Sequence, residues 1–75
     1  MGKGEVGKRL RVLREARALS QSDCARQMGV NRSLVCRVEL GQAAPYPKFR
    51  RRAAEILNLP EEIVFARAVP DGRGT

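Results

Sequence analysis

The sequence predicts an all-α fold in which five short helices form a compact bundle. Apolar residues make up 43% of the chain and are mostly Leu, Val, Ile, Ala and Met, which suit helices better than sheets. In several segments they recur at helical spacing, and Gly, Asn or Pro separates one such segment from the next. At 75 residues the chain has room for one small domain. We expect that domain to span residues 5–69.

The first helix is expected over residues 4–18. Its apolar residues share one side at the spacing of an amphipathic helix, and charged residues fill the other sides. The apolar set is Val6, Leu10 and Leu13, and the charged set is Lys8, Arg9, Arg11 and Glu15. Before this helix, the Gly-rich residues 1–4 are expected to form a flexible N-terminal arm.

The second helix is expected to begin after Ser20, whose hydroxyl suits the N-cap position, with Asp23 at the third helical position. These two residues form the pattern of a capping box. Leu19 is placed to pack on Cys24 as a hydrophobic staple. Gly29 then ends the helix, because glycine readily adopts the left-handed conformation that terminates helices.

A very tight turn separates the second helix from the third. Asn31 is a good N-cap for a helix over residues 32–40, and Val30 can pack on Val35 at its start. Gly41 stops this third helix. Two short helices therefore meet across a few residues, which predicts that they cross at a steep angle.

A loop and a fourth helix follow. Residues 42–47 are expected to be irregular because Pro45 and Pro47 forbid a helix through them. The fourth helix ends at Asn58, and its apolar residues at helical spacing are Phe49, Ala53, Ile56 and Leu57.

The fifth helix is expected from Pro60, a good first helical residue, to about residue 68. Glu61 and Glu62 suit the positive N-terminal end of such a helix. Residues 70–75 are expected to form a disordered tail.

Charge and composition narrow the possible functions. Fifteen Lys and Arg against eight Asp and Glu give a net charge of +7, which indicates a polyanionic partner. Nucleic acid is the first choice, and an anionic membrane surface is the second. The chain has no histidine and two cysteines, so it cannot complete a four-ligand zinc site or a catalytic triad alone. Without a Gly-rich phosphate loop, secretory signal or membrane span, we expect a cytoplasmic protein with no enzyme activity, metal or cofactor.

Residues 21–40 carry the main functional signal. Small and apolar residues stand where two helices must approach closely, with Ala25 in the second helix and Gly29 at the turn. This pattern resembles the helix-turn-helix of the phage repressor and Cro family, the Xre type, over residues 7–65. The matching stretches are 10–15, 19–21, 24–25, 29–30, Val35, 38–41, Pro45 and 54–59. Cys24, Asn58 and the pair Ala43-Ala44 depart from the family pattern, which usually has leucine, glycine and basic residues there.

The resemblance implies a sequence-specific transcriptional regulator, with repression the expected role, that binds double-stranded DNA. Its second helix would lie across the DNA backbone while its third helix enters the major groove. At 100° per residue, the free side of the third helix spans about 140°. The expected base contacts on that side are Arg32, Ser33, Cys36 and Arg37. Both arginines can pair with N7 and O6 of guanine, so the operator should contain G·C pairs.

Phosphate contacts are expected around the third helix. Gln21 lies at the N-terminus of the second helix, where free N–H groups favour a phosphate, and the resemblance implies that this glutamine touches the DNA backbone. The full expected set is Gln21, Gln42, Lys48 and Arg50. The run of arginines at 50–52 can alternatively form a solvated cationic face.

Two further pairs of residues call for an interpretation. The resemblance implies that Arg14 and Glu39 form a structural ion pair between the first and third helices. Cys24 is most simply a small core residue. Cys36 lies on the expected DNA face, where it can contact a thymine methyl group or, beside two arginines, sense oxidation.

The last expectation concerns partners. The fifth helix is apolar on most of its circumference, so we expect a two-fold homodimer through Ile63, Val64 and Phe65, bound to an inverted-repeat operator. The alternative is that this helix is mostly core and two copies meet only on DNA. Two other functions compete with the regulator: an antitoxin-type or adaptor module that binds a protein partner, and a membrane-coating basic peptide. The peptide is the weakest, because caps and glycines divide the chain into short helices that need one another.

Overall fold

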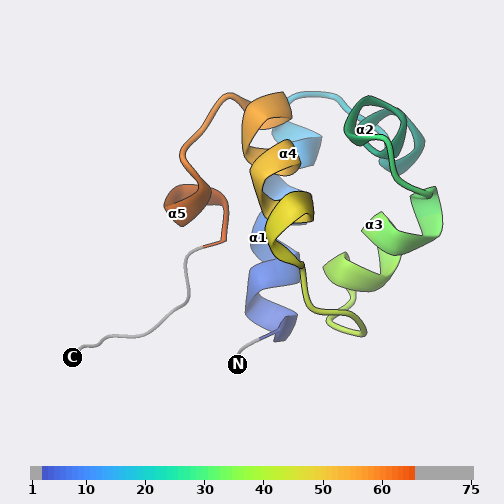
Figure 1. Ribbon diagram of the computed structural model, residues 1–75, viewed down its shortest axis with the longest axis vertical. Helices are drawn as coiled ribbons and strands as arrows, with labels where there is room; N and C mark the ends of the chain where they lie inside the picture. The colour runs from blue at the N-terminus through green and yellow to red at the C-terminus, as the bar shows by residue number, and fades with distance from the viewer. Residues whose placement is uncertain (1–2, 66–75) are drawn as a thin grey trace.

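Five helices follow one another along the chain in the computed structural model, which describes residues 3–65 and the side chains of residues 6–65 (Figure 1). They are α1 (Lys3–Ala16), α2 (Gln21–Met28), α3 (Arg32–Glu39), α4 (Pro47–Leu57) and α5 (Glu61–Val64). No strand occurs among residues 3–65. The predicted all-α fold with five helices is confirmed.

The helices divide into a central pair and two flanks. Helix α1 and helix α4 lie at the centre of the molecule, with α2 and α3 on one flank and α5 on the other (Figure 1). Helix α2 packs on α3 and α4, α3 packs on α1, and α5 packs on α4 and α1. The pair α2–α3 is therefore supported from behind, and its outer side is open to solvent.

One apolar core holds this arrangement together. Its side chains come from all five helices, and eight of the largest are almost completely buried: Phe49, Leu10, Met28, Leu57, Val35, Val38, Val64 and Cys24. Cys24 is a core residue, as predicted, and burial raises the pKa of its thiol. Edge-to-face contacts of Phe49 with Tyr46 and Phe65, with ring centroids 6.0 and 6.4 Å apart, connect the core to the loop before α4 and to the end of α5.

Helices α1 to α4 all end in the same way. Just past the last helical turn of each, one residue has a positive φ angle, and the N–H groups of this residue and the next donate hydrogen bonds to carbonyls of that turn. This is the Schellman motif. The four residues are Ala18, Gly29, Gly41 and Asn58, with φ angles of 56, 74, 79 and 57°. The predicted ends at Gly29 and Asn58 are confirmed, whereas α1 and α3 end slightly earlier than expected, at Ala16 and Glu39.

The helix starts agree with the sequence only in part. The Ser20 hydroxyl accepts a hydrogen bond from the N–H of Asp23 at 3.0 Å, so the predicted N-cap of α2 is confirmed. Hydrogen bonds from Arg26 and Ser20 lower the pKa of the Asp23 carboxyl group. Asn31 occupies the N-cap position of α3, but its side chain makes no capping hydrogen bond. Instead, the backbone carbonyl of Asn31 accepts from the N–H of Leu34 at 3.0 Å, one of the two N–H groups that a capping side chain can use.

Other predicted boundaries need correction. Helix α1 begins at Lys3, inside the segment that was expected to be an arm. Pro47 is the first residue of α4 rather than part of the loop, because proline lacks only the N–H group that a first helical residue does not use. Pro60 is the N-cap of α5 and not its first residue, and α5 is a single turn. The expected continuation of α5 to residue 68 and the tail at 70–75 lie outside the described residues.

Ala18 offers a test of the helix-end geometry. It is an alanine at a position where glycine is favoured, because the left-handed region costs other L-residues about 1–2 kcal/mol. The substitution Ala18→Gly is therefore expected to raise the free energy of unfolding by about 0.5–1 kcal/mol, after the larger backbone entropy of unfolded glycine is subtracted. Urea denaturation measures this change. Ala16→Gly, inside the last turn of α1, should destabilise instead, and destabilisation by both variants would contradict the left-handed geometry.

Candidate nucleic-acid interface

The outer side of α3 carries the side chains expected to touch DNA bases. Arg32, Ser33 and Arg37 are exposed, and Cys36 is half-buried. The opposite side of the same helix is buried through Val35, Val38 and Glu39. The structure thus brings the four expected base-contact residues together on one solvent-facing surface, which we call the α3 face: Arg32, Ser33, Cys36 and Arg37.

The two arginines of the α3 face have few internal contacts. The Arg37 side chain makes no hydrogen bond or ion pair with any described residue. Arg32 has a single one, a long hydrogen bond of 3.4 Å from a terminal guanidinium nitrogen to Oε1 of Gln21. Neither charge is neutralised by an acidic side chain within residues 6–65, so both keep their full positive charge for an external anion or base edge.

A buried ion pair lies directly behind the α3 face. Nε of Arg14 is 2.7 Å from Oε2 of Glu39, and a second guanidinium nitrogen donates to Oε1 at 3.1 Å. The third nitrogen donates to the carbonyl oxygen of Leu19 at 2.6 Å. Arg14 and Glu39 are 6% and 7% exposed, and the hydrogen bond to Glu39 raises the pKa of Arg14 above its ordinary value. This pair, which the family resemblance implied, connects α1 to α3 through a bidentate contact.

Gln21 extends this contact to the surface. Its side-chain nitrogen donates to Oε1 of Glu39 at 3.0 Å, and its oxygen accepts from Arg32. A carboxylate can only accept hydrogen bonds, so Glu39 fixes which end of the Gln21 amide points outward. A chain of hydrogen bonds therefore runs from buried Arg14 to exposed Arg32. Sequence reasoning predicted the Arg14–Glu39 pair but missed its continuation through Gln21 to Arg32, because these residues are far apart in the sequence and no single pattern joins them.

The remaining phosphate candidates occupy different places. Gln42 is exposed just after α3, and Lys48 is exposed in the first turn of α4. Arg50 has a different orientation: its Nε lies 3.7 Å from Oε1 of Glu61, the first residue of α5. Because α5 lies on the flank opposite to α2 and α3 (Figure 1), Arg50 is not brought together with the α3 face.

Comparison with known proteins agrees with this geometry. A family model described as a helix-turn-helix domain matches residues 5–64. The chain belongs to this helix-turn-helix family, of the Xre type. A solved structure, the restriction-modification controller protein C.AhdI from Aeromonas hydrophila, matches this helix-turn-helix domain with a TM-score of 0.79 and 35% identity, over 83% of this chain and 94% of that one. No curated protein matches the chain.

Membership of the helix-turn-helix family makes the protein a DNA-binding transcriptional regulator. In helix-turn-helix domains generally, the second helix of the motif is the recognition helix and the first crosses the DNA backbone. Helices α2 and α3 are the first and second helices of the motif in this chain. Domains of this family typically bind DNA without catalysing a reaction. No group of three or more metal-binding side chains occurs in the described part of the domain. Within the same range, no helix has the length and apolar character needed to cross a membrane.

The expected dimer surface on α5 of the helix-turn-helix domain requires a correction. Val64 is fully buried in its own chain, so it has no surface to offer a second copy. Phe65 is half-buried, with its ring edge on Phe49. Only Ile63, at 41% exposed, presents a large apolar side chain outward. The apolar pattern of α5 was too short to show which side faces the core, because a single helical turn has no clear periodicity.

Proposed function

We propose that the protein is a homodimeric repressor that reads an inverted-repeat operator with the α3 face in the major groove. The observation that carries this proposal is the exposed α3 face with two arginines that no acidic side chain within residues 6–65 neutralises. The net charge of +7 adds non-specific attraction to DNA. The similarity to a restriction-modification controller favours restriction-modification genes as the genes that this protein regulates.

Direct base reading is assigned to the two arginines. Each has a planar guanidinium group that can donate two hydrogen bonds to N7 and O6 of one guanine. Ser33 can donate or accept, so it discriminates less between bases. Gln21, Gln42 and Lys48 are assigned to backbone phosphates, where they set the register of α3 without reading sequence.

The proposal is tested by selecting, from a pool of random DNA duplexes, the sequences that the protein binds. The selected sequence then serves as the operator on which the variants are measured. We expect Arg32→Ala and Arg37→Ala each to lose about 1–3 kcal/mol of binding free energy on the selected site, with a much smaller loss on random DNA. Binding isotherms at fixed salt measure both losses.

The matched control is Gln42→Ala, which removes a proposed phosphate contact and should weaken both kinds of DNA to the same extent. If the arginine variants behave like this control, the arginines contact phosphates and not bases. If the selection enriches no sequence at all, the proposal of a specific operator is wrong.

The dimer is assigned to the exposed part of α5. Ile63→Glu places a charge where a second copy would remove water, so it should convert a dimer of the free protein to a monomer. Sedimentation equilibrium at tens of micromolar measures the mass. Glu62→Gln, an exposed neighbour, is the control. Two results together would contradict this assignment: the free parent protein is a monomer, and Ile63→Glu binds the operator as cooperatively as the parent does. The two copies would then meet elsewhere.

A further inference from the structure

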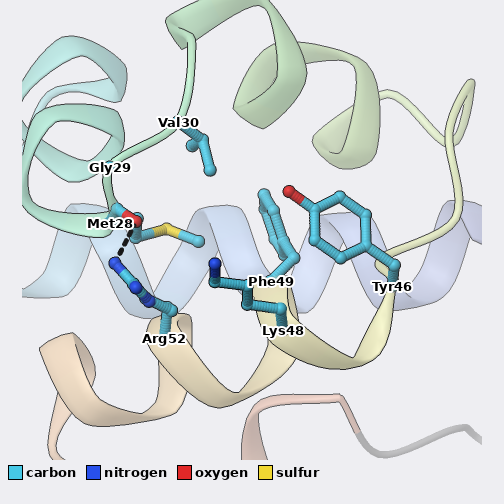
Figure 2. Close-up of a pocket in the computed structure, with 7 residues that line it drawn as sticks. All are labelled: Met28, Gly29, Val30, Tyr46, Lys48, Phe49 and Arg52. Carbon is cyan, nitrogen blue, oxygen red and sulfur yellow. Dashed lines mark hydrogen bonds between the residues drawn. The ribbon is translucent and has the colours of Figure 1, made fainter.

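A small cavity opens between the end of α2 and the first turns of α4, and Lys48 is its only lining residue among the expected DNA contacts. Its volume is about 90 Å³. Seven residues line it, as Figure 2 shows: Met28, Gly29, Val30, Tyr46, Lys48, Phe49 and Arg52. The apolar members form one part of the wall, and the polar ends of the others border the opening. No acidic side chain is among them.

The polar groups converge on this space from two directions. In Figure 2 the ammonium group of Lys48 points into the space between Met28 and Phe49, and the hydroxyl of Tyr46 points toward it from the other side. Arg52 borders the cavity near Gly29, where a guanidinium nitrogen donates to the carbonyl oxygen of Met28 at 3.1 Å. This hydrogen bond holds the guanidinium plane in place, so its other N–H groups are oriented in advance.

The charges at the cavity are not balanced within the chain. Neither Lys48 nor Arg52 forms an ion pair with a residue in the described range. Two cations beside one small space repel each other, and an anion placed between them removes this repulsion and adds charge-assisted hydrogen bonds.

The volume limits what the cavity can take. A water molecule needs at least about 10–15 Å³ of such volume, so 90 Å³ has room for several waters or for one tetrahedral or planar oxyanion group. An aromatic ring needs more room, since a cavity that binds benzene measures about 150 Å³. A phosphate or carboxylate group therefore fits inside this cavity, whereas a whole nucleobase does not.

We propose that this cavity binds one oxyanion group, with Lys48 and Arg52 as charged ligands and Tyr46 as a hydrogen-bond donor. The group can come from free inorganic phosphate or from a phosphate of bound DNA. The site also touches the helix-turn-helix itself. Arg52 donates a hydrogen bond to the carbonyl oxygen of Met28, the last residue of α2. A Cβ atom added at Gly29 would lie 3.2 Å from the guanidinium group of Arg52. An anion that fixes Arg52 thereby fixes the turn before α3.

The first arm of the test uses the free protein without DNA. Inorganic phosphate is titrated at constant ionic strength, with chloride as the reference, and the amide signals of Gly29 and Phe49 are followed by NMR. We expect a saturable shift that Lys48→Met and Arg52→Met weaken about tenfold or more, which is the usual value of a hydrogen bond to a charged group. Arg51→Met, on the same helix but outside this cavity, should leave the titration unchanged. Tyr46→Phe keeps the fold and removes only the hydroxyl, so it tests the site even if Arg52→Met destabilises α2.

The second arm measures binding of the same variants to a random duplex. If free phosphate gives no saturable shift but Lys48→Met and Arg52→Met each weaken duplex binding several-fold more than Arg51→Met, the bound group is a DNA phosphate. If phosphate and chloride act alike and all three variants bind DNA equally, the cavity is not an oxyanion site. The first arm contains no DNA, so its outcome does not depend on the proposed function.

Discussion

Arg14→Met is expected to lower the free energy of unfolding by about 3–5 kcal/mol. The substitution leaves the carboxylate of Glu39, 7% exposed, without its bidentate partner in a poorly solvated place. It also removes the hydrogen bond to the Leu19 carbonyl, which helps to hold the chain between α1 and α2. Because a small domain has a total stability of only about 5–15 kcal/mol, this one change should bring the protein close to unfolding at growth temperature. Urea denaturation followed by circular dichroism measures the loss.

The matched variant is the double substitution Arg14→Met with Glu39→Met. Removing both charges avoids the uncompensated carboxylate, so the double variant should be more stable than Arg14→Met alone. Glu39→Met also deprives Gln21 of its acceptor, and this cost remains in the double variant. If Arg14→Met costs less than about 1 kcal/mol, the pair behaves as an exposed one and does not hold α3 against α1.

Gly7→Ala is expected to destabilise the fold by about 1–3 kcal/mol, the usual cost of inserting a methyl group into a filled space. A Cβ atom at this position would overlap the carbonyl oxygen of Val38 and lie 2.5 Å from that of Glu39. Both atoms belong to the backbone of α3, so the whole helix must move to relieve the overlap. At an ordinary position inside a helix the same change stabilises by about 1 kcal/mol, and the reversed sign identifies the close contact.

Gly7→Ala should also weaken operator binding, although Gly7 is no part of the α3 face. The displaced helix would carry Arg32 and Arg37 away from the base edges that we propose they contact. Thermal unfolding and binding isotherms give the two readouts, and Lys8→Ala, an exposed neighbour on α1, is the control. A variant that is as stable as the parent and binds DNA normally would show that α1 and α3 are not in backbone contact at this point.

Local signals explain why part of the fold could be predicted from the sequence. Ser20, Gly29 and Asn58 mark helix ends through their own chemistry, so their positions could be predicted without knowing what packs nearby. Ala18 carries no such signal, and its left-handed conformation depends on the hydrogen bonds that close α1. Asn31 has a side chain that suits a cap, yet it is the backbone carbonyl of Asn31 that accepts from the N–H of Leu34.

The residues of the candidate site likewise include some that could be placed from the sequence and some that could not. Helical spacing was enough to place Arg32, Ser33, Cys36 and Arg37 on one side of α3, because that side is set by the buried residues of the same helix. The burial of Val64 and the attachment of Arg50 to α5 depend on contacts between helices, which spacing does not encode. Gly7 had a detectable signal: a glycine on the apolar side of a helix costs stability and so indicates a close approach.

The α3 face has a consequence for how such a regulator can change its target. The side chains of Ser33 and Arg37 make no hydrogen bond or ion pair with a described residue, and exposed side chains of this kind usually tolerate exchange within about 0.5 kcal/mol. Substitutions at residues 33 and 37 can therefore change which operator sequence the protein prefers while the fold stays intact. Arg32 is different, because its partner Gln21 is held by a buried carboxylate. Under the proposed function, new preferences should arise first at positions 33 and 37, and related regulators should retain the base pair in each half-site that we propose Arg32 contacts.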